Sequence, residues 1–136
     1  MSVEGELVDR FEADPYADHL NMRLVEVRPG YARAEMEAAE ELCSFHGYLQ
    51  GGAMISLADY AFAAASNSHG PNAVALSITF NFVGLVRPGR RLSAEATEEK
   101  LGRRTGLYRL EVRTEDGGLV GSGQGMAYRQ EPATGS

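Results

Sequence analysis

The chain has few of the residues that mark secreted or membrane proteins. Its 136 residues include one cysteine, Cys43, so no disulfide framework can form within it and a reducing compartment is expected. The N-terminal segment 1–15 is acidic and lacks an apolar core, which argues against a signal peptide. No run approaches the roughly 18 to 20 apolar residues that cross a bilayer. We therefore expect a cytoplasmic protein with no membrane segment.

Basic residues and metal-ligand spacings are also scarce. The chain has 13 lysines and arginines against 19 acidic residues, and its formal net charge of -6 argues against a nucleic-acid binder. The net charge does not exclude a local basic patch that binds a phosphorylated ligand. The histidines, His19, His46 and His69, lie far apart and form no metal-ligand pattern. We predict no metal site and no bound cofactor.

The length and the order of patterns predict a single domain over residues 1–136. Apolar residues at helical spacing predict a short N-terminal helix within 1–15, which Pro15 ends. The turn at Pro29-Gly30 divides 22–38 into two strands, and a flexible tail is expected over 130–136. Further strands are predicted over residues 73–86, 92–101, 104–114 and 119–129.

Between the second and third strands lies a helix, AMISLADYAFAAASNS, that is apolar on nearly every face and is therefore expected to be buried. A glycine-containing loop over 40–52 leads into it, and a stop signal follows at 67–71. One long helix on a five- or six-stranded antiparallel sheet is an α+β arrangement. The helix cannot cover both faces of this sheet, so we expect association into a dimer or tetramer that protects apolar groups and edges.

Asp59 is the polar residue that stands out inside this helix. A carboxylate among apolar neighbours costs several kcal/mol unless it is paired or reaches solvent. No lysine, arginine or histidine lies three or four residues away to pair it. Two interpretations remain open: Asp59 faces water, or it is a partly desolvated carboxylate with a raised pKa that acts as a general base or nucleophile.

The residues Gln50, Gly51 and Gly52 stand where this helix begins. Unpaired N–H groups and the helix dipole favour a developing negative charge there, and glycine lets a carbonyl approach the backbone. This layout is typical of an oxyanion hole. Asp59 lies eight residues after Gly51, about 12 Å along the helix axis. Both groups can therefore serve one carbonyl only if they come from two different subunits.

Three blocks of the chain together resemble one family. They are SFHGYLQGGAMISLADYAFAAASNSHGP, VALSITFNFVGLVRPG and KLGRRTGLYRLEVR. Over about residues 20–129 the chain resembles the hotdog-fold thioesterases of the PaaI type, which are named for phenylacetate degradation. The resemblance implies a hotdog fold, in which a sheet wraps one long central helix. It also implies a dimer of hotdogs with active sites at the interface, and we expect a homotetramer.

The family pattern Asn-x-x-Gly-x-x-His-Gly-Gly, then four residues and Leu-x-Asp, implies the site residues. Asp59 would either attack the thioester itself or activate a water molecule. The Gly51 N–H would polarise the thioester carbonyl, with Gly52 next to it. The resemblance assigns a water-orienting hydroxyl to Ser77. Two positions depart from the pattern: Ser44 replaces the asparagine and Gln50 the histidine. The base and the backbone donor are kept, so we expect activity with an altered rate or specificity.

Substrate contacts follow from the chemistry of coenzyme A. Its phosphates suit arginine forks, and of the basic turns at 87–91 and 100–104 we favour Arg103 and Arg104. The acyl group would meet an apolar wall formed by Leu57, Tyr60, Ala61 and Phe82.

The expected function is hydrolysis of an acyl-CoA to free acid and CoA, with (hydroxy)phenylacetyl-CoA or a related aromatic thioester as substrate. Two alternatives are a hotdog dehydratase or hydratase and a non-catalytic acyl-CoA-binding module. The dehydratase hypothesis is weakened because Gln50 stands at the position of the motif histidine. The binding module gives no reason for a carboxylate at Asp59. We expect an acyl-CoA substrate and a homo-oligomer, with no nucleic-acid and no membrane partner.

Overall fold

The computed structural model describes residues 5–70 and 72–130. Parts of the predicted N-terminal helix (residues 1–4) and of the predicted tail (residues 131–136) lie outside this range. The helices and strands follow in the order α1 (Gly5–Glu12), α2 (Pro15–His19), β1 (Arg23–Arg28), β2 (Tyr31–Glu37), the 3-10 turn η1 (Glu40–Leu42), α3 (Gly51–Ser66), β3 (Ala73–Phe82), β4 (Arg91–Leu101), β5 (Thr105–Thr114) and β6 (Leu119–Arg129).

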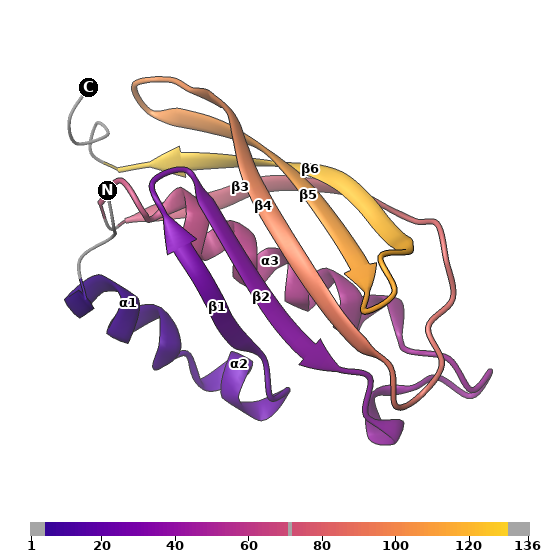
Figure 1. Cartoon of the computed structure of the whole chain (residues 1–136). Coiled ribbons are helices and arrows are strands. Elements are labelled where there is room, and N and C mark those ends of the chain that lie inside the picture. Colours follow the sequence, from indigo (N-terminus) through magenta and orange to yellow (C-terminus); the bar gives the residue numbers. More distant parts are fainter. Residues whose placement is uncertain (1–4, 71, 131–136) are drawn as a thin grey trace.

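The strands form one antiparallel sheet in the order β1-β2-β4-β5-β6-β3. The α+β class, the six strands and the single long helix are therefore confirmed. In Figure 1 the sheet curves around α3, while α1 and α2 lie alongside the edge strand β1. At the other edge, β3 pairs with β6 and with no second strand among the described residues. Every helix in the described part of the chain is too short or too polar to span a bilayer.

Small side chains let α3 lie close against the sheet. The facing positions of β2 and β4 are alanines without solvent exposure, namely Ala32, Ala34, Ala94 and Ala96. Most of α3 is buried, as its apolar composition predicts. The helix ends at Ser66, and Asn67 provides the C-cap, within the predicted stop region. Because the helix is buried on its sheet-facing side, only a narrow stripe of it reaches solvent.

Glycines in β6 make room for large aromatic rings beneath the sheet. A Cβ on Gly121 would lie 2.5 Å from the ring of Phe80, and a Cβ on Gly125 would lie 2.7 Å from the ring of Phe62. Phe62 is almost fully buried. A Cβ on Gly123 would lie 2.0 Å from the Thr79 carbonyl oxygen, so the backbones of β6 and β3 approach closely there.

The N-terminal helices are fixed by a cap and by a hydrogen bond to α3. Pro15 follows the end of α1 and begins α2, where its missing N–H costs nothing. The Asp14 side chain accepts hydrogen bonds from the backbone N–H groups of Tyr16 (2.9 Å) and Ala17 (3.1 Å). The Tyr60 hydroxyl donates to the Phe11 carbonyl at 3.0 Å. The two short helices are thus held beside the central helix.

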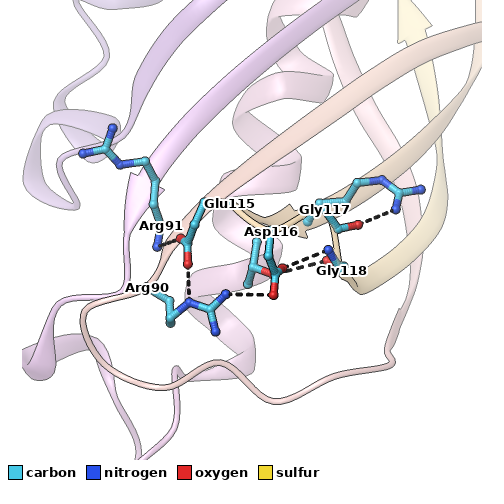
Figure 2. Close-up of polar contacts among 8 residues, drawn as sticks. Arg90, Arg91, Glu115, Asp116, Gly117 and Gly118 are labelled. Atoms are coloured by element: carbon cyan, nitrogen blue, oxygen red, sulfur yellow. Dashed lines mark hydrogen bonds and ion pairs between the residues drawn. The ribbon is translucent and has the colours of Figure 1, made fainter.

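A group of ion pairs joins the connection that follows β3 to the turn between β5 and β6 (Figure 2). The Arg90 guanidinium contacts the carboxylates of Glu115 and Asp116, the latter at 3.3 Å. Glu115 also accepts a hydrogen bond from the Arg91 backbone N–H. A hydrogen bond from the Thr114 hydroxyl is the main reason that the pKa of Asp116 falls to about 2. The Arg90 guanidinium is therefore held by two carboxylates of the turn between β5 and β6.

We predict that Gly121→Ala destabilises the protein by about 1–3 kcal/mol, because the added methyl overlaps the Phe80 ring. Urea unfolding curves of the two proteins, fitted with one common m-value, measure the change in the free energy of unfolding. The control is Ser122→Ala, in which the neighbouring half-buried side chain only becomes smaller. A Gly121→Ala protein with a wild-type unfolding midpoint would contradict the packing described here.

Candidate active site

Asp59 lies on the one stripe of α3 that reaches solvent. Gly52, Asp59 and Ala63 are exposed, and Ser56, one turn before Asp59, is half-buried. Among the residues that the structure describes, none forms a hydrogen bond or ion pair with the Asp59 carboxylate. The first interpretation, a water-facing residue, and the second, a perturbed carboxylate, both describe part of this environment.

Burial raises the pKa of Asp59 above its ordinary value, and repulsion from the Asp14 carboxylate adds to the shift. Solvent reaches the carboxylate from one side, whereas the surrounding protein removes enough water on the other side to disfavour its ionised form. The absence of a basic partner among the described residues leaves this shift uncompensated. A carboxylate with a raised pKa and no counter-charge suits proton abstraction or nucleophilic attack.

The first turn of α3 presents free backbone donors. Gln50 is the N-cap, and its carbonyl accepts from the N–H groups of Ala53 and Met54. The N–H groups of Gly51 and Gly52 have no backbone acceptor within the described part of the chain. They point out of the helix N-terminus, where an anion is favoured. Two free backbone donors therefore lie where the sequence predicts an oxyanion hole, and their role stays a prediction.

Phe82 covers this first turn. A Cβ on Gly51 would approach the Phe82 ring to 3.0 Å, so the ring lies directly against the glycine backbone. The ring is 52% exposed and packs edge-on against Phe80, with a centroid distance of 5.5 Å. An apolar surface thus lies beside the free N–H groups, and the contact of Phe82 with an acyl group stays a prediction.

Gln50 and Ser44, the two positions that depart from the family pattern, differ in the hydrogen bonds that their side chains form. The Gln50 side chain is exposed and forms no capping hydrogen bond. Ser44 begins a tight loop, in which its Oγ accepts from the His46 N–H at 3.2 Å and its carbonyl accepts from the Gly47 N–H. Both Ser44 oxygens therefore accept bonds within the loop, while the Ser44 hydroxyl and the Gln50 amide donate to no residue that the structure describes.

Ser77 lies on β3, opposite Met126 and next to a bulge that follows Ala75. It is exposed, and no hydrogen bond joins its hydroxyl to Asp59 within the described residues of one chain. The role of Ser77 in orienting water stays a prediction.

The structure corrects two positions of the predicted acyl wall, Leu57 and Ala61. Leu57 and Ala61 are fully buried in the core, and Tyr60 is buried with its hydroxyl bonded to α1. Leu57 and Ala61 therefore offer no surface to a ligand in this chain, whereas Tyr60 lines a pocket beside β1 and Phe82 stays exposed. A helix that is apolar on nearly all faces carries no periodicity from which its outward face can be predicted.

The predicted phosphate-binding arginines lie in the hairpin turn between β4 and β5. Arg103 and Arg104 are exposed, and the Arg104 guanidinium donates to the Gln130 carbonyl. The Arg104 carbonyl accepts from the Arg129 N–H, and Arg129 in turn donates to the Ser66 carbonyl. This chain of contacts places both arginines near the C-terminal end of α3, at the opposite end from Gly51.

Residues 46–121 match the thioesterase superfamily. This chain belongs to that superfamily. Acyl-coenzyme A thioesterase PaaI of Escherichia coli is 32% identical over 119 residues, which cover 88% of this chain and 85% of that protein. The PaaI structure from the Escherichia coli phenylacetic acid degradation operon matches with a TM-score of 0.88 and 30% identity, over 92% of this chain and 91% of that one.

A further solved relative is a point mutant of the phenylacetic acid degradation protein PaaI from Thermus thermophilus. It is 40% identical, with a TM-score of 0.82, over 85% of this chain and 99% of that chain. The chain is thus a hotdog-fold thioesterase of the PaaI type, and it is an enzyme that hydrolyses thioesters. The family resemblance and the hotdog fold expected from the sequence are confirmed.

The pKa shift predicts how Asp59 affects stability. A folded-state pKa above the unfolded value means that ionising Asp59 costs stability, which is lost as pH rises from the unfolded pKa through the folded one. We therefore expect Asp59→Asn to raise Tm at neutral pH and to leave Tm unchanged at a pH below both values. Calorimetry at the two pH values checks this. A lower Tm for Asp59→Asn at neutral pH would contradict the desolvated carboxylate.

Proposed function

We propose that the enzyme hydrolyses aromatic acyl-CoA thioesters, with Asp59 as the reacting carboxylate and the Gly51 N–H as the oxyanion donor. The observation that carries this proposal is the unpaired Asp59 carboxylate on the solvent-facing stripe of a buried apolar helix, within the part of the chain that the structure describes. The names of the relatives, which mention acyl-coenzyme A and phenylacetic acid degradation, support the choice of substrate.

The active site is shared between two copies of the chain. Asp59 and Gly51 stand on the same helix about 12 Å apart, so one subunit cannot bring both to one carbonyl. If β3 pairs antiparallel with its copy about a two-fold axis, the two α3 helices run in opposite directions. The first turn of one helix then faces the later turns of the other, and Gly51 of one copy meets Asp59 of its partner.

The edge of the sheet supports this dimer. β3 and the segment after it carry large apolar side chains that are half or more exposed, namely Val74, Leu76, Phe82, Val83 and Leu85. An exposed apolar edge strand is a template for pairing with another chain. The same arrangement brings Arg103 and Arg104, near the C-terminal end of α3, toward the partner's Gly51 turn. There they would bind the phosphates of CoA.

The reaction needs a nucleophile and a stabilised oxyanion. On one route Asp59 takes a proton from water, and the water oxygen bonds to the thioester carbon as the carbonyl electrons move onto oxygen. The Gly51 N–H stabilises that oxyanion, and its collapse breaks the C–S bond. The thiolate takes up the proton, giving free acid and CoA. On the other route the Asp59 carboxylate attacks the carbonyl carbon and displaces the CoA thiolate, which leaves an anhydride. Water hydrolyses the anhydride to the free acid and regenerates Asp59, and the second proton of that water goes to the thiolate.

Asp59→Asn tests the assigned base. We expect a loss of kcat of at least about 100-fold, because an amide neither accepts the proton nor attacks the carbonyl. Thiol release from a panel of acyl-CoAs, phenylacetyl-CoA included, measures this. A variant that kept nearly full turnover would refute the role of Asp59. Wild-type protein that binds CoA compounds without hydrolysing any thioester would favour a binding module.

Gly51→Pro tests the oxyanion donor. Proline is well tolerated at the first helical position, and the extended backbone of Gln50 (φ -60°, ψ 138°) suits a residue before proline. The change removes the N–H, so we expect kcat to fall about 100- to 1000-fold. Gly51→Ala is the matched control, since it adds the same Cβ against Phe82 and keeps the donor. Equal losses in the two variants would assign the effect to crowding.

A further inference from the structure

Tyr16, on the short helix α2, is tied directly to the stripe of α3 that carries Asp59. Its hydroxyl lies 2.9 Å from the Ser56 Oγ, across 40 residues of sequence. Ser56 donates its only hydroxyl proton to the Gly52 carbonyl at 2.8 Å. The Tyr16 hydroxyl is therefore the donor to Ser56. This relay fixes the end of the Tyr16 ring over the helix.

The place of Ser56 brings the ring to the proposed active site. Ser56 is three residues before Asp59, and residues three apart on a helix lie on the same face. On that face the exposed residues are Gly52, Asp59 and Ala63. A ring anchored at Ser56 therefore lies beside the exposed stripe from which a substrate would reach the Asp59 carboxylate.

The Tyr16 ring is not needed to hold the N-terminal helices in place. The burial of Ala17, which is 2% exposed, and the hydrogen bond from Tyr60 to Phe11 already hold α1 and α2 in place. The Tyr16 side chain, by contrast, stays 58% exposed although its hydroxyl is fixed. A large aromatic surface that is held in one orientation and left open is suited to contact a ligand.

Asp14 fixes the ring from the backbone side. As the N-cap of α2 it accepts the Tyr16 N–H, so the position of Tyr16 is set at both its backbone and its hydroxyl. The Asp14 carboxylate also acts on Asp59, which it disfavours as an anion. Both effects place α2 on the Asp59 side of the central helix.

We propose that Tyr16 is a specificity-determining residue, whose ring forms the wall of the acyl site beside Asp59 and selects aromatic acyl groups. The inference rests on the proposed thioesterase site. An aromatic acyl group stacks offset or edge-on against such a ring, an interaction that a flexible aliphatic chain does not gain. Tyr16 thereby supplies an apolar wall that the fully buried residues Leu57 and Ala61 do not.

The test compares kcat/KM for phenylacetyl-CoA and hexanoyl-CoA. We expect Tyr16→Ala to lower the aromatic-to-aliphatic ratio by about two- to tenfold. Tyr16→Phe keeps the ring and loses the tether, and Ser56→Ala loses the same tether from the other side. Each single variant should lower the ratio by less than Tyr16→Ala. The double variant Tyr16→Phe/Ser56→Ala should match either single one, because both changes break one interaction.

An unchanged ratio in Tyr16→Ala, or equal losses for both substrates, would overturn the assignment to Tyr16. A lower Tm with a wild-type ratio would do the same, since it would show a structural role only. If Tyr16→Ala does not fold, the two tether variants and their double variant decide by the same criteria. Turnover by Asp59→Asn would instead refute the proposed function, so the two failures are distinguishable.

Discussion

The structure depends on the close contact between α3 and a sheet lined with small residues. Alanines on β2 and β4 bring the helix backbone near the strands, and glycines on β6 admit the rings of Phe62 and Phe80. An apolar helix in such a curved sheet has one narrow stripe left for polar groups. A carboxylate on that stripe is partly desolvated without being sealed from solvent, which is the environment that a reacting carboxylate requires.

The same contact explains why the proposed site needs a second subunit. The helix runs without a break from Gly51 to Ser66, so its donor end and its carboxylate are held apart. The sheet surrounds the helix but leaves the apolar edge of β3 uncovered. Pairing of two β3 strands would satisfy that edge and complete the site in one step. Stability and chemistry would then rest on one interface.

Much of this arrangement follows from short-range patterns in the sequence. The boundaries of α3, the glycines at its start and the isolated Asp59 depend on neighbours within one or two helical turns, so the sequence predicts them. The glycines of β6 leave room for large rings, but Phe62, which fills the space at Gly125, is far away in the chain. Other features of the site depend on contacts that leave no local mark. The bond between Tyr16 and Ser56 spans 40 residues, and nothing near either residue indicates it. The outward face of α3 could not be assigned either, because an almost uniformly apolar helix has no polar side to orient it.

The shared active site is tested most directly with mixed dimers of Asp59→Asn and Gly51→Pro subunits, purified by two different affinity tags. In a mixed dimer one site carries both defects, while the other combines an intact Asp59 with an intact Gly51 from the partner subunit. We predict about half of the wild-type activity, although each variant alone is nearly inactive. Mixed dimers no more active than the separate variants would show that the two residues do not meet across an interface.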